Sequence, residues 1–381
     1  MPSNRLHFID AMRTFAILMM LQGHFVYEML ADAFRDDNNP VYATWKYFRG
    51  VTAPVFFTVS GFIFTYLLIR NPQYGWANPR VKKGIRRALY IIMWGYLLRL
   101  NVWMLFKGEI TNSSIAVDVL HCIGFSLLYI ITIYVVAGKH YKTGLPIVML
   151  ATGIVVFALN PLYEKYPVEF IPRFAANYFT NYYGSVFTLI PWIGYATLGS
   201  FLGILFYRYK ETKNFLNKAV LILAPMGLFL IFVSSPLFEL LSGWTGINLF
   251  LRISQNNYLF MRFGDVLMFF SVFILIRKYL EHHVIEVLGK KTLTIYILHF
   301  IVLYGSWIGW GIVRAYKHAL DPFETIFSVL VFILGICVFT YYFEKEALTA
   351  WIKNSKPYRL IFVQIPRFVL RKLKSTVQTR Y

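Results

Sequence analysis

The chain has 381 residues, of which 58% are hydrophobic, 19% are aromatic and only 15% are charged. Soluble globular proteins carry about 25% charged residues and fewer apolar ones, and apolar runs of about 18 or more residues recur here from end to end. This composition excludes a soluble enzyme. It predicts an all-α, polytopic membrane helical bundle with no separate soluble domain.

Apolar segments separated by charged breaks predict ten membrane-spanning helices. They lie near residues 8–30, 47–69, 86–106, 117–137, 144–160, 186–207, 219–239, 258–276, 292–311 and 324–343. The segment 160–185 is rich in aromatic residues and proline, so we expect it to be re-entrant or interfacial. We predict one transmembrane domain over residues 1–343, followed by a basic amphipathic cytoplasmic tail over residues 344–381.

The first span is expected to remain in the mature protein. Its apolar part runs from Phe15 to Leu30, which is longer than the roughly 7–15 apolar residues of a cleavable signal, and Asp10 stands where a signal carries positive charge. The two cysteines, Cys122 and Cys337, both fall inside apolar spans. The sequence therefore predicts no disulfide framework.

Lysine and arginine are unevenly distributed between the two sides of the predicted bundle. The N-terminal segment, alternate connections and the tail hold 26 of the 38, the opposite connections hold eight, and four lie inside spans. The positive-inside rule therefore predicts that both termini are cytoplasmic. The net charge of +20 is explained by this topology and by contact with anionic lipid rather than by nucleic-acid binding.

The first span carries a polar stripe. Arg13 and His24 are eleven residues apart, which places them on one helix face within about 20° and about 16 Å apart along the axis. Asp10 is three residues before Arg13, a spacing at which the two can pair. The predicted orientation puts Arg13 near the cytoplasmic edge and His24 in the outer half. A purely structural alternative is that Arg13 reaches the cytoplasmic headgroups and His24 packs against a neighbouring carbonyl group.

Other spans place polar residues at similar depth. Arg99 reaches the outer half of the third span, and Asp118 and His121 stand three residues apart at the outer start of the fourth. His299 lies near mid-depth in the ninth span, with Tyr296 on the same face. Ionisable residues inside membrane spans are costly and mark functional sites. Together with His24 and with Arg262 and Asp265 of the eighth span, these residues predict a polar cavity open to the outside.

Two further groups of charged residues have a simpler explanation available. Arg262 and Asp265, three residues apart in the eighth span, are typical of a structural ion pair. Five basic residues surround the cytoplasmic start of the third span: Arg80, Lys82, Lys83, Arg86 and Arg87. The positive-inside rule alone could explain this cluster, but a basic helix N-terminus is also an anion site, where a phosphorylated cofactor would bind.

These residues resemble a known family. RLHFIDAMRTFAILMMLQGHF, with its Arg-x10-His spacing at Arg13 and His24, is similar to the opening of the transmembrane acyltransferase superfamily. PVFFTVSGFIFTYLL, from Pro54 to Leu68, resembles its second span, and KKGIRRALYIIMWGYLLR, DVLHCIGFSLLY and LGKKTLTIYILHF resemble later blocks, the last ending on His299. The superfamily includes the acyltransferase type 3 proteins and the heparan-alpha-glucosaminide N-acetyltransferase-like proteins.

The resemblance implies an integral membrane acyltransferase in a plasma membrane, the bacterial inner membrane, and polysaccharide modification at the cell envelope. The donor would be cytosolic acyl-CoA, above all acetyl-CoA, and the acceptor a hydroxyl group, in preference to an amine, of an extracytoplasmic glycan or glycolipid. The family's catalytic residues carried over are His24 and Arg13. From the residues themselves we predict donor binding by the five basic residues of the third span and acceptor binding by Arg99, Asp118, His121 and His299, with no metal. Thr14 departs from the family pattern, in which a small residue follows the arginine, and this leaves the subfamily open.

The residues allow more than one mechanism and more than one function. Neutral imidazole, with an ordinary pKa of about 6.5, could take the proton of the acceptor hydroxyl, or His24 could itself be acetylated first. The same polar stripe could instead line the path of a transporter for a sugar or organic anion. A third possibility is a histidine-dependent acyltransferase of another fold that works on the inner side.

Overall fold

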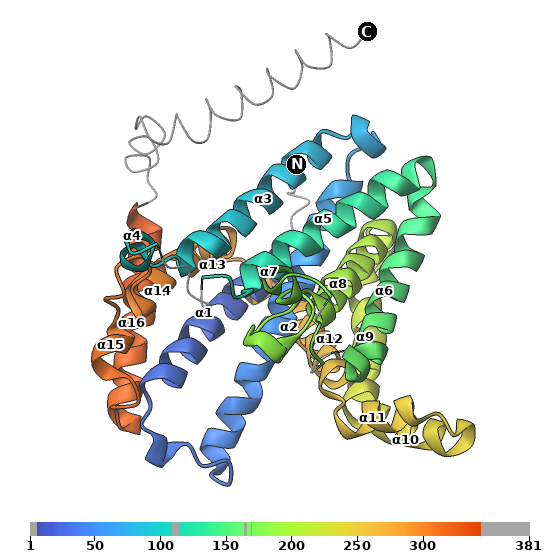
Figure 1. Cartoon of the computed structure of the whole chain (residues 1–381). Helices are drawn as coiled ribbons and strands as arrows, with labels where there is room; N and C mark the ends of the chain where they lie inside the picture. Colours follow the sequence, from blue (N-terminus) through green and yellow to red (C-terminus); the bar gives the residue numbers. More distant parts are fainter. Residues whose placement is uncertain (1–5, 109–113, 164–165, 169, 344–381) are drawn as a thin grey trace.

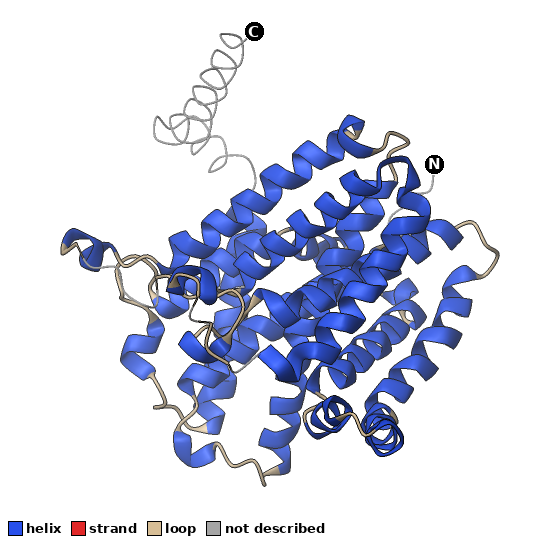
Figure 2. Cartoon of the chain, turned by 45° about the vertical axis from the view of Figure 1, so that its right-hand side comes forward, coloured by secondary structure: helices blue, strands red, loops and turns tan. Residues whose placement is uncertain are grey.

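The structure is a computed structural model that describes residues 6–108, 114–163, 166–168 and 170–343. Within these residues the chain is helical and contains no β-strand, apart from isolated bridges that join Leu30 to Leu320 and Asn101 to Trp307. Figure 1 and Figure 2 show the helices gathered into one bundle. The predicted tail, residues 344–381, lies outside the described residues.

Each of the ten predicted spans overlaps one long helix. These helices are α1 (His7–Met29), α2 (Pro40–Ile69), α3 (Pro79–Arg99), α5 (Val119–Ala137), α6 (Tyr141–Tyr163), α8 (Leu189–Tyr209), α9 (Phe215–Phe232), α12 (Tyr258–Leu275), α14 (Thr292–Tyr304) and α16 (Pro322–Phe343). Shorter helices occupy the connections: α4 (Val102–Phe106), α7 (Arg173–Ala176), α10 (Ser234–Thr245), α11 (Asn248–Gln255), α13 (His283–Lys290) and α15 (Ile312–Tyr316).

The all-α polytopic bundle is therefore confirmed. By length and composition, six helical segments of the described chain can cross a membrane, with α5 and α6 taken as one. The pair α13 and α14, bent by 69°, makes a seventh if it is one span. The count of ten spans and the cytoplasmic termini stay predictions.

Helix α3 differs from the predicted span, 86–106, at both ends. It begins at Pro79, because the side chain of Asn78 accepts a hydrogen bond from the Arg80 backbone N–H and proline suits the first helical position. It ends at Arg99, and Asn101 then caps the separate helix α4. The basic cluster consequently lies within the first turns of a continuous helix.

Two other predicted spans are shorter in the structure. The segment 219–239 divides at Val233 into α9 and α10. The segment 292–311 ends at Tyr304, because Gly305 adopts a left-handed conformation with φ of 69° and terminates the helix. The left-handed conformation of Gly305 therefore sets the direction of Tyr304, the last residue of α14.

Helix α2 lies at the centre of the bundle and packs closely on α8. A Cβ on Gly61 would lie 1.9 Å from the carbonyl oxygen of Ala196, and a Cβ on Gly199 would lie 2.0 Å from that of Thr58. Such contacts allow two backbones to touch, which is the usual role of small residues between membrane helices. In the most apolar stretch of α8, 72% of the residues are buried inside the bundle. In the corresponding stretch of α9, only 17% are buried. Helix α9 is therefore peripheral, and α2 and α8 form the core that supports the site.

Candidate functional site

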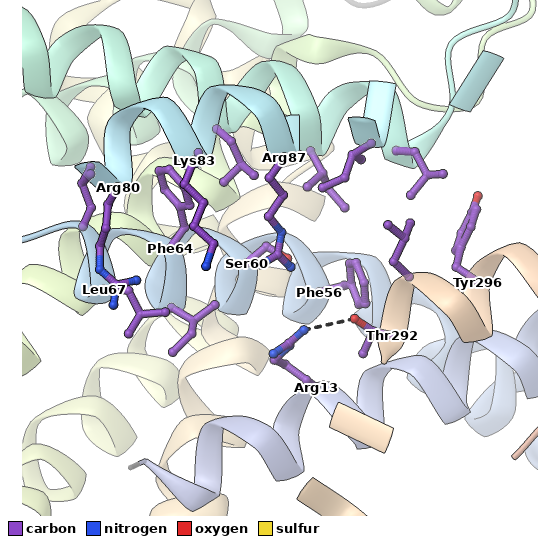
Figure 3. A pocket seen from close by; sticks show the side chains of 18 residues that line it. Arg13, Phe56, Ser60, Phe64, Leu67, Arg80, Lys83, Arg87, Thr292 and Tyr296 are labelled. Carbon is purple, nitrogen blue, oxygen red and sulfur yellow. Dashed lines mark hydrogen bonds between the residues drawn. The ribbon is translucent and has the colours of Figure 1, made fainter. Parts of the chain in front are cut away.

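A cavity of about 220 Å³ opens between α1, α2, α3, α5 and α14. One end is lined by basic side chains, and the walls are apolar (Figure 3). The wall residues come mainly from α2 and α5 and include Phe56, Ile63, Phe64, Leu67, Leu120 and Ile123. We call this space the basic cavity.

Helix α3 presents three of its five basic residues to the basic cavity. Arg80, Lys83 and Arg87 line it, whereas Lys82 and Arg86 do not. The spacing explains the division, because residues three, four and seven apart share one helix face and the other two point about 110° away. Figure 3 shows the three side chains directed towards Arg13 on the other side of the cavity.

Arg13 enters the basic cavity from α1. One of its guanidinium nitrogens lies 3.9 Å from the Asp10 carboxylate, and the other donates to the Thr292 hydroxyl at 3.2 Å. The expected Asp10–Arg13 pair is thus present. No aspartate or glutamate is among the described residues that line the cavity, so four cations face the same space. This end has the charge and shape to hold a polyanion.

Thr14 has a structural role that explains its departure from the family pattern. Its hydroxyl donates to the carbonyl oxygen of Ile285 at 2.8 Å. The same hydroxyl oxygen of Thr14 would lie 3.0 Å from a Cβ on Gly289. Helix α1 therefore lies directly against α13. The threonine joins these two helices and does not face the basic cavity.

Tyr296 stands at the far end of the basic cavity and connects it to a buried polar cluster. Its hydroxyl donates to the Asp118 carboxylate at 3.0 Å, and Arg99 Nε lies 3.4 Å from the same oxygen. Asp118 also caps α5 by accepting from the Val119 backbone N–H. Hydrogen bonds to a carboxylate are stronger than those between neutral groups, so this side chain joins α3, α5 and α14 firmly.

His121 is held in place by backbone and aromatic contacts. Its Nδ1 accepts from the Asp118 backbone N–H at 3.0 Å, and its ring packs 4.2 Å from the ring of Tyr96. A Cβ on Gly95 would lie 2.7 Å from the imidazole, so α3 and α5 enclose the ring. Its Nε2 has no hydrogen-bond partner among the described residues.

In the segment 160–185, which we expect to be re-entrant or interfacial, Asn177 and Tyr178 contact the start of α5 and the end of α3. Asn177 is buried and donates to the carbonyl oxygen of Ile115 at 3.1 Å. The hydroxyl of Tyr178 forms a short hydrogen bond with that of Tyr96, and the Tyr178 ring packs on Phe125. Burial raises the pKa of the Tyr178 hydroxyl above its usual range. The segment covers the polar cluster.

His24 lies at the other end of that cluster. Its ring packs edge-on against His299, with centroids 5.3 Å apart, and His299 packs 4.9 Å from Tyr296. Neither ring nitrogen of His299, which is fully buried, has a hydrogen-bond partner among the described residues. The Tyr304 hydroxyl lies 3.3 Å from His24 Nδ1 and 3.4 Å from a Glu28 carboxylate oxygen. A continuous chain of side chains thus joins the basic cavity to His24.

Arg262 and Asp265 form the structural pair expected from their spacing. Their side chains lie 2.9 Å apart, and the Tyr47 hydroxyl donates to the same carboxylate at 2.7 Å. This pair joins α12 to α2 and does not line the basic cavity. Both cysteines are free. In the part of the chain that the structure describes, no three His, Cys, Asp or Glu side chains gather as metal ligands.

The sequence profile of the family described as heparan-alpha-glucosaminide N-acetyltransferase, catalytic, matches residues 5–234, more than half of the chain. The chain belongs to this family. It is therefore a membrane protein of an acetyltransferase family, while the resemblance to acyltransferase type 3 proteins stays a prediction. A comparison with curated proteins found no significant match.

The matched region of this acetyltransferase holds only part of the site. It runs from the start of α1 to the start of α10 and includes Arg13, His24 and the basic residues of α3. His299, Tyr296 and Tyr304 lie beyond it, on α14.

Three residues near the site were not anticipated from the acetyltransferase sequence. The place of Glu28 could have been predicted from the sequence, because Glu28 stands four residues after His24 and so shares its helix face. The place of Tyr304 could not, since only the tertiary fold brings it to α1. Arg49 lies beside Gly23, with its guanidinium 4.3 Å from the centre of the Tyr27 ring.

Proposed function

We propose that this protein transfers an acetyl group from cytosolic acetyl-CoA to a glycan or glycolipid on the opposite face of the membrane. The observation that carries the proposal is the connection between two different sites. A cavity with four cations lies at one end, and His24 lies at the other, joined through Tyr296 and His299.

The basic cavity suits the donor. The phosphates of CoA would bind Arg80, Lys83, Arg87 and Arg13, because charged hydrogen bonds to phosphate are the strong ones. The apolar wall from Phe64 to Ile123 would accommodate the pantetheine arm. That arm must bridge about 16 Å, the rise between Arg13 and His24 along α1, which is comparable to its extended length.

His24 would serve as the base at the reacting carbon. Neutral imidazole takes the proton of the acceptor O–H or N–H while the acceptor atom bonds to the thioester carbonyl carbon. The C–S bond then breaks, and the CoA thiolate leaves and is protonated. Direct transfer needs no covalent enzyme intermediate. The alternative, acetylation of His24 itself, would leave labelled protein after donor alone is added.

An assay with two matched oligosaccharide acceptors would identify the atom that is acetylated. The family description names an N-acetyltransferase of a glucosaminide, whereas the resemblance to the transmembrane acyltransferase superfamily favours a hydroxyl group. An oligosaccharide ending in glucosamine offers both groups, and its N-acetylated form offers only hydroxyls. Alkali-labile label on the blocked form would identify O-acetylation, and alkali-stable label on the free amine alone would identify N-acetylation.

The deciding experiment uses proteoliposomes in which the protein has one orientation. Radiolabelled acetyl-CoA is supplied at the face that carries the termini, and the two oligosaccharides are trapped on the other face. We expect label on the trapped acceptor with wild-type protein and none with His24→Ala. Label only on acceptor that shares a face with the donor would refute the transmembrane mechanism. Uptake of acceptor without acetylation would favour a transporter.

A further inference from the structure

The Tyr304 hydroxyl lies between a carboxylate and the proposed catalytic histidine. It is 3.4 Å from Glu28 Oε1 and 3.3 Å from His24 Nδ1. Glu28 and His24 are one turn apart on α1, and Tyr304 is the last residue of α14. These contacts are long, as is usual for catalytic hydrogen bonds before substrate binds.

The number of protons available decides the direction of both hydrogen bonds. A tyrosine hydroxyl has one proton and two lone pairs, and an ionised carboxylate can only accept. The Tyr304 proton therefore points to Glu28, and its oxygen is left to accept from the His24 Nδ1–H. A neutral imidazole has a single N–H. With that proton on Nδ1, Nε2 carries a free lone pair.

We propose that Glu28 and Tyr304 are positioning residues that hold His24 in the Nδ1–H tautomer and so make Nε2 the base. The inference rests on the proposed function, in which His24 accepts the proton of the acceptor. Its logic is that of the carboxylate in a Ser-His-Asp triad, which fixes the tautomer and orientation of the histidine. Here a phenol stands between the acid and the imidazole.

The backbone around this relay holds both partners in place. The segment after α15 ties down the end of α1, because the backbone N–H groups of His318 and Leu320 donate to the carbonyl oxygens of Glu28 and Met29 at 2.9 and 3.0 Å. On α14, the Tyr304 ring packs 4.8 Å from Phe300. A Cβ on Gly305 would lie 2.3 Å from the backbone of Gly311. The helix end is thus fixed tightly against the loop that follows.

No other neighbour in the described chain competes for His24 Nδ1. His299 faces the ring edge-on with centroids 5.3 Å apart, and neither of its nitrogens has a hydrogen-bond partner. Asp118, Arg49 and Arg99 influence His24 only through charge at longer range. Tyr304 is therefore the contact that can select one tautomer.

The test replaces each relay residue and measures two independent quantities. Tyr304→Phe and Glu28→Gln should lower kcat for acetyl transfer about 100-fold, the lower end of the usual contribution of general-base catalysis, with KM for acetyl-CoA unchanged because the basic cavity is intact. Glu28→Asp, which keeps the charge, should recover part of the loss. Tyr27→Phe, next to Glu28 but exposed, is the matched control and should keep wild-type kcat.

The second quantity is the reactivity of the His24 imidazole towards diethyl pyrocarbonate, followed by mass spectrometry of the His24 peptide. An unprotonated ring nitrogen attacks a carbonyl carbon of this reagent and becomes carbethoxylated, so both relay variants should slow modification about threefold or more as the Nε2 lone pair becomes less available. This readout does not require acetyl transfer. It therefore separates failure of the relay from failure of the proposed function.

Two results would overturn the relay. One is a Tyr304→Phe variant with wild-type kcat while His24→Ala is inactive. The other is equal His24 modification rates in Tyr304→Phe and wild-type protein. A loss of kcat in the Tyr27→Phe control equal to that in Tyr304→Phe would also count against it, because the effect would then belong to this end of α1 in general.

Discussion

Two double variants of α3 offer a sharp test of the basic cavity, because they remove the same charge from different faces of one helix. Lys83→Gln with Arg87→Gln removes two cations that line the cavity. Lys82→Gln with Arg86→Gln removes two that do not, from neighbouring positions. Both pairs are expected on the cytoplasmic side, so topology and net charge change equally. Only the direction of the side chains differs.

The expected magnitude follows from the two hydrogen bonds to phosphate that the Lys83 and Arg87 variant can no longer make. Coulomb attraction between one cation and one phosphate charge 4 Å apart is about 4 kcal/mol at an effective dielectric constant near 20. After desolvation, a charged hydrogen bond contributes about 1.5 kcal/mol net. Two such bonds amount to about 3 kcal/mol, so the Kd for CoA should rise about 100-fold. For the other pair, whose side chains do not line the cavity, we expect about threefold or less, because mobile ions screen exposed charges beyond a Debye length of about 10 Å.

The assay is calorimetric titration of CoA into purified protein in detergent at two salt concentrations. The loss of affinity in the Lys83 and Arg87 variant should shrink at high salt, since mobile ions screen the attraction in the wild type. Equal losses in the two variants would mean that total charge, and not this cavity, attracts the donor. Wild-type affinity in both would mean that the cluster serves topology alone and would refute the donor site.

Two further predictions concern stability and are measured by thermal unfolding in detergent. Asp118→Asn should destabilise the protein by about 2–4 kcal/mol, because the amide has one acceptor oxygen where the carboxylate uses two and it leaves the half-buried Arg99 beside a neutral partner; an unchanged melting temperature would contradict the cluster described above. Gly199→Ala should abolish accumulation of folded protein, since its Cβ would lie 2.0 Å from the Thr58 carbonyl oxygen, whereas Gly144→Ala, with no atom within 4 Å, should accumulate normally.

Periodicity alone predicts the features of the site that lie within one helix. Arg13 pairs with Asp10 at the spacing expected, and Arg262 pairs with Asp265 in the same way. His24 and Arg13 both face α14, as their shared stripe requires. In each case the geometry depends on the 100° step of the helix, which the sequence already contains.

Features that depend on contacts between helices could not be predicted in this way. The basic residues of α3 fall on two faces, and only packing against α1, α2 and α14 decides that Lys83 rather than Lys82 lines the cavity. The relay through Tyr304 joins positions 280 residues apart. The segment 160–185 has the composition of an interface, yet Tyr178 reaches the Tyr96 side chain. These outcomes are decided by tertiary packing.

His299 is a polar residue in the apolar interior of the bundle, and the proposed acceptor site would explain its presence there. Both of its ring nitrogens are buried without a hydrogen-bond partner in the described residues. A buried polar group in that state costs about 1–3 kcal/mol, and an apolar residue of similar volume would remove that penalty. The Nε2 of His121, in the same cluster, is in the same state. Among the described residues, buried polar atoms without a hydrogen-bond partner also occur elsewhere in the bundle, as in Trp45 and Thr58, but those of His299 and His121 lie around the proposed acceptor site. The acceptor's own hydroxyl or amine groups would supply the missing hydrogen-bond partners. The acceptor would therefore bind at the buried ring nitrogens whose lack of partners lowers the stability of the free protein.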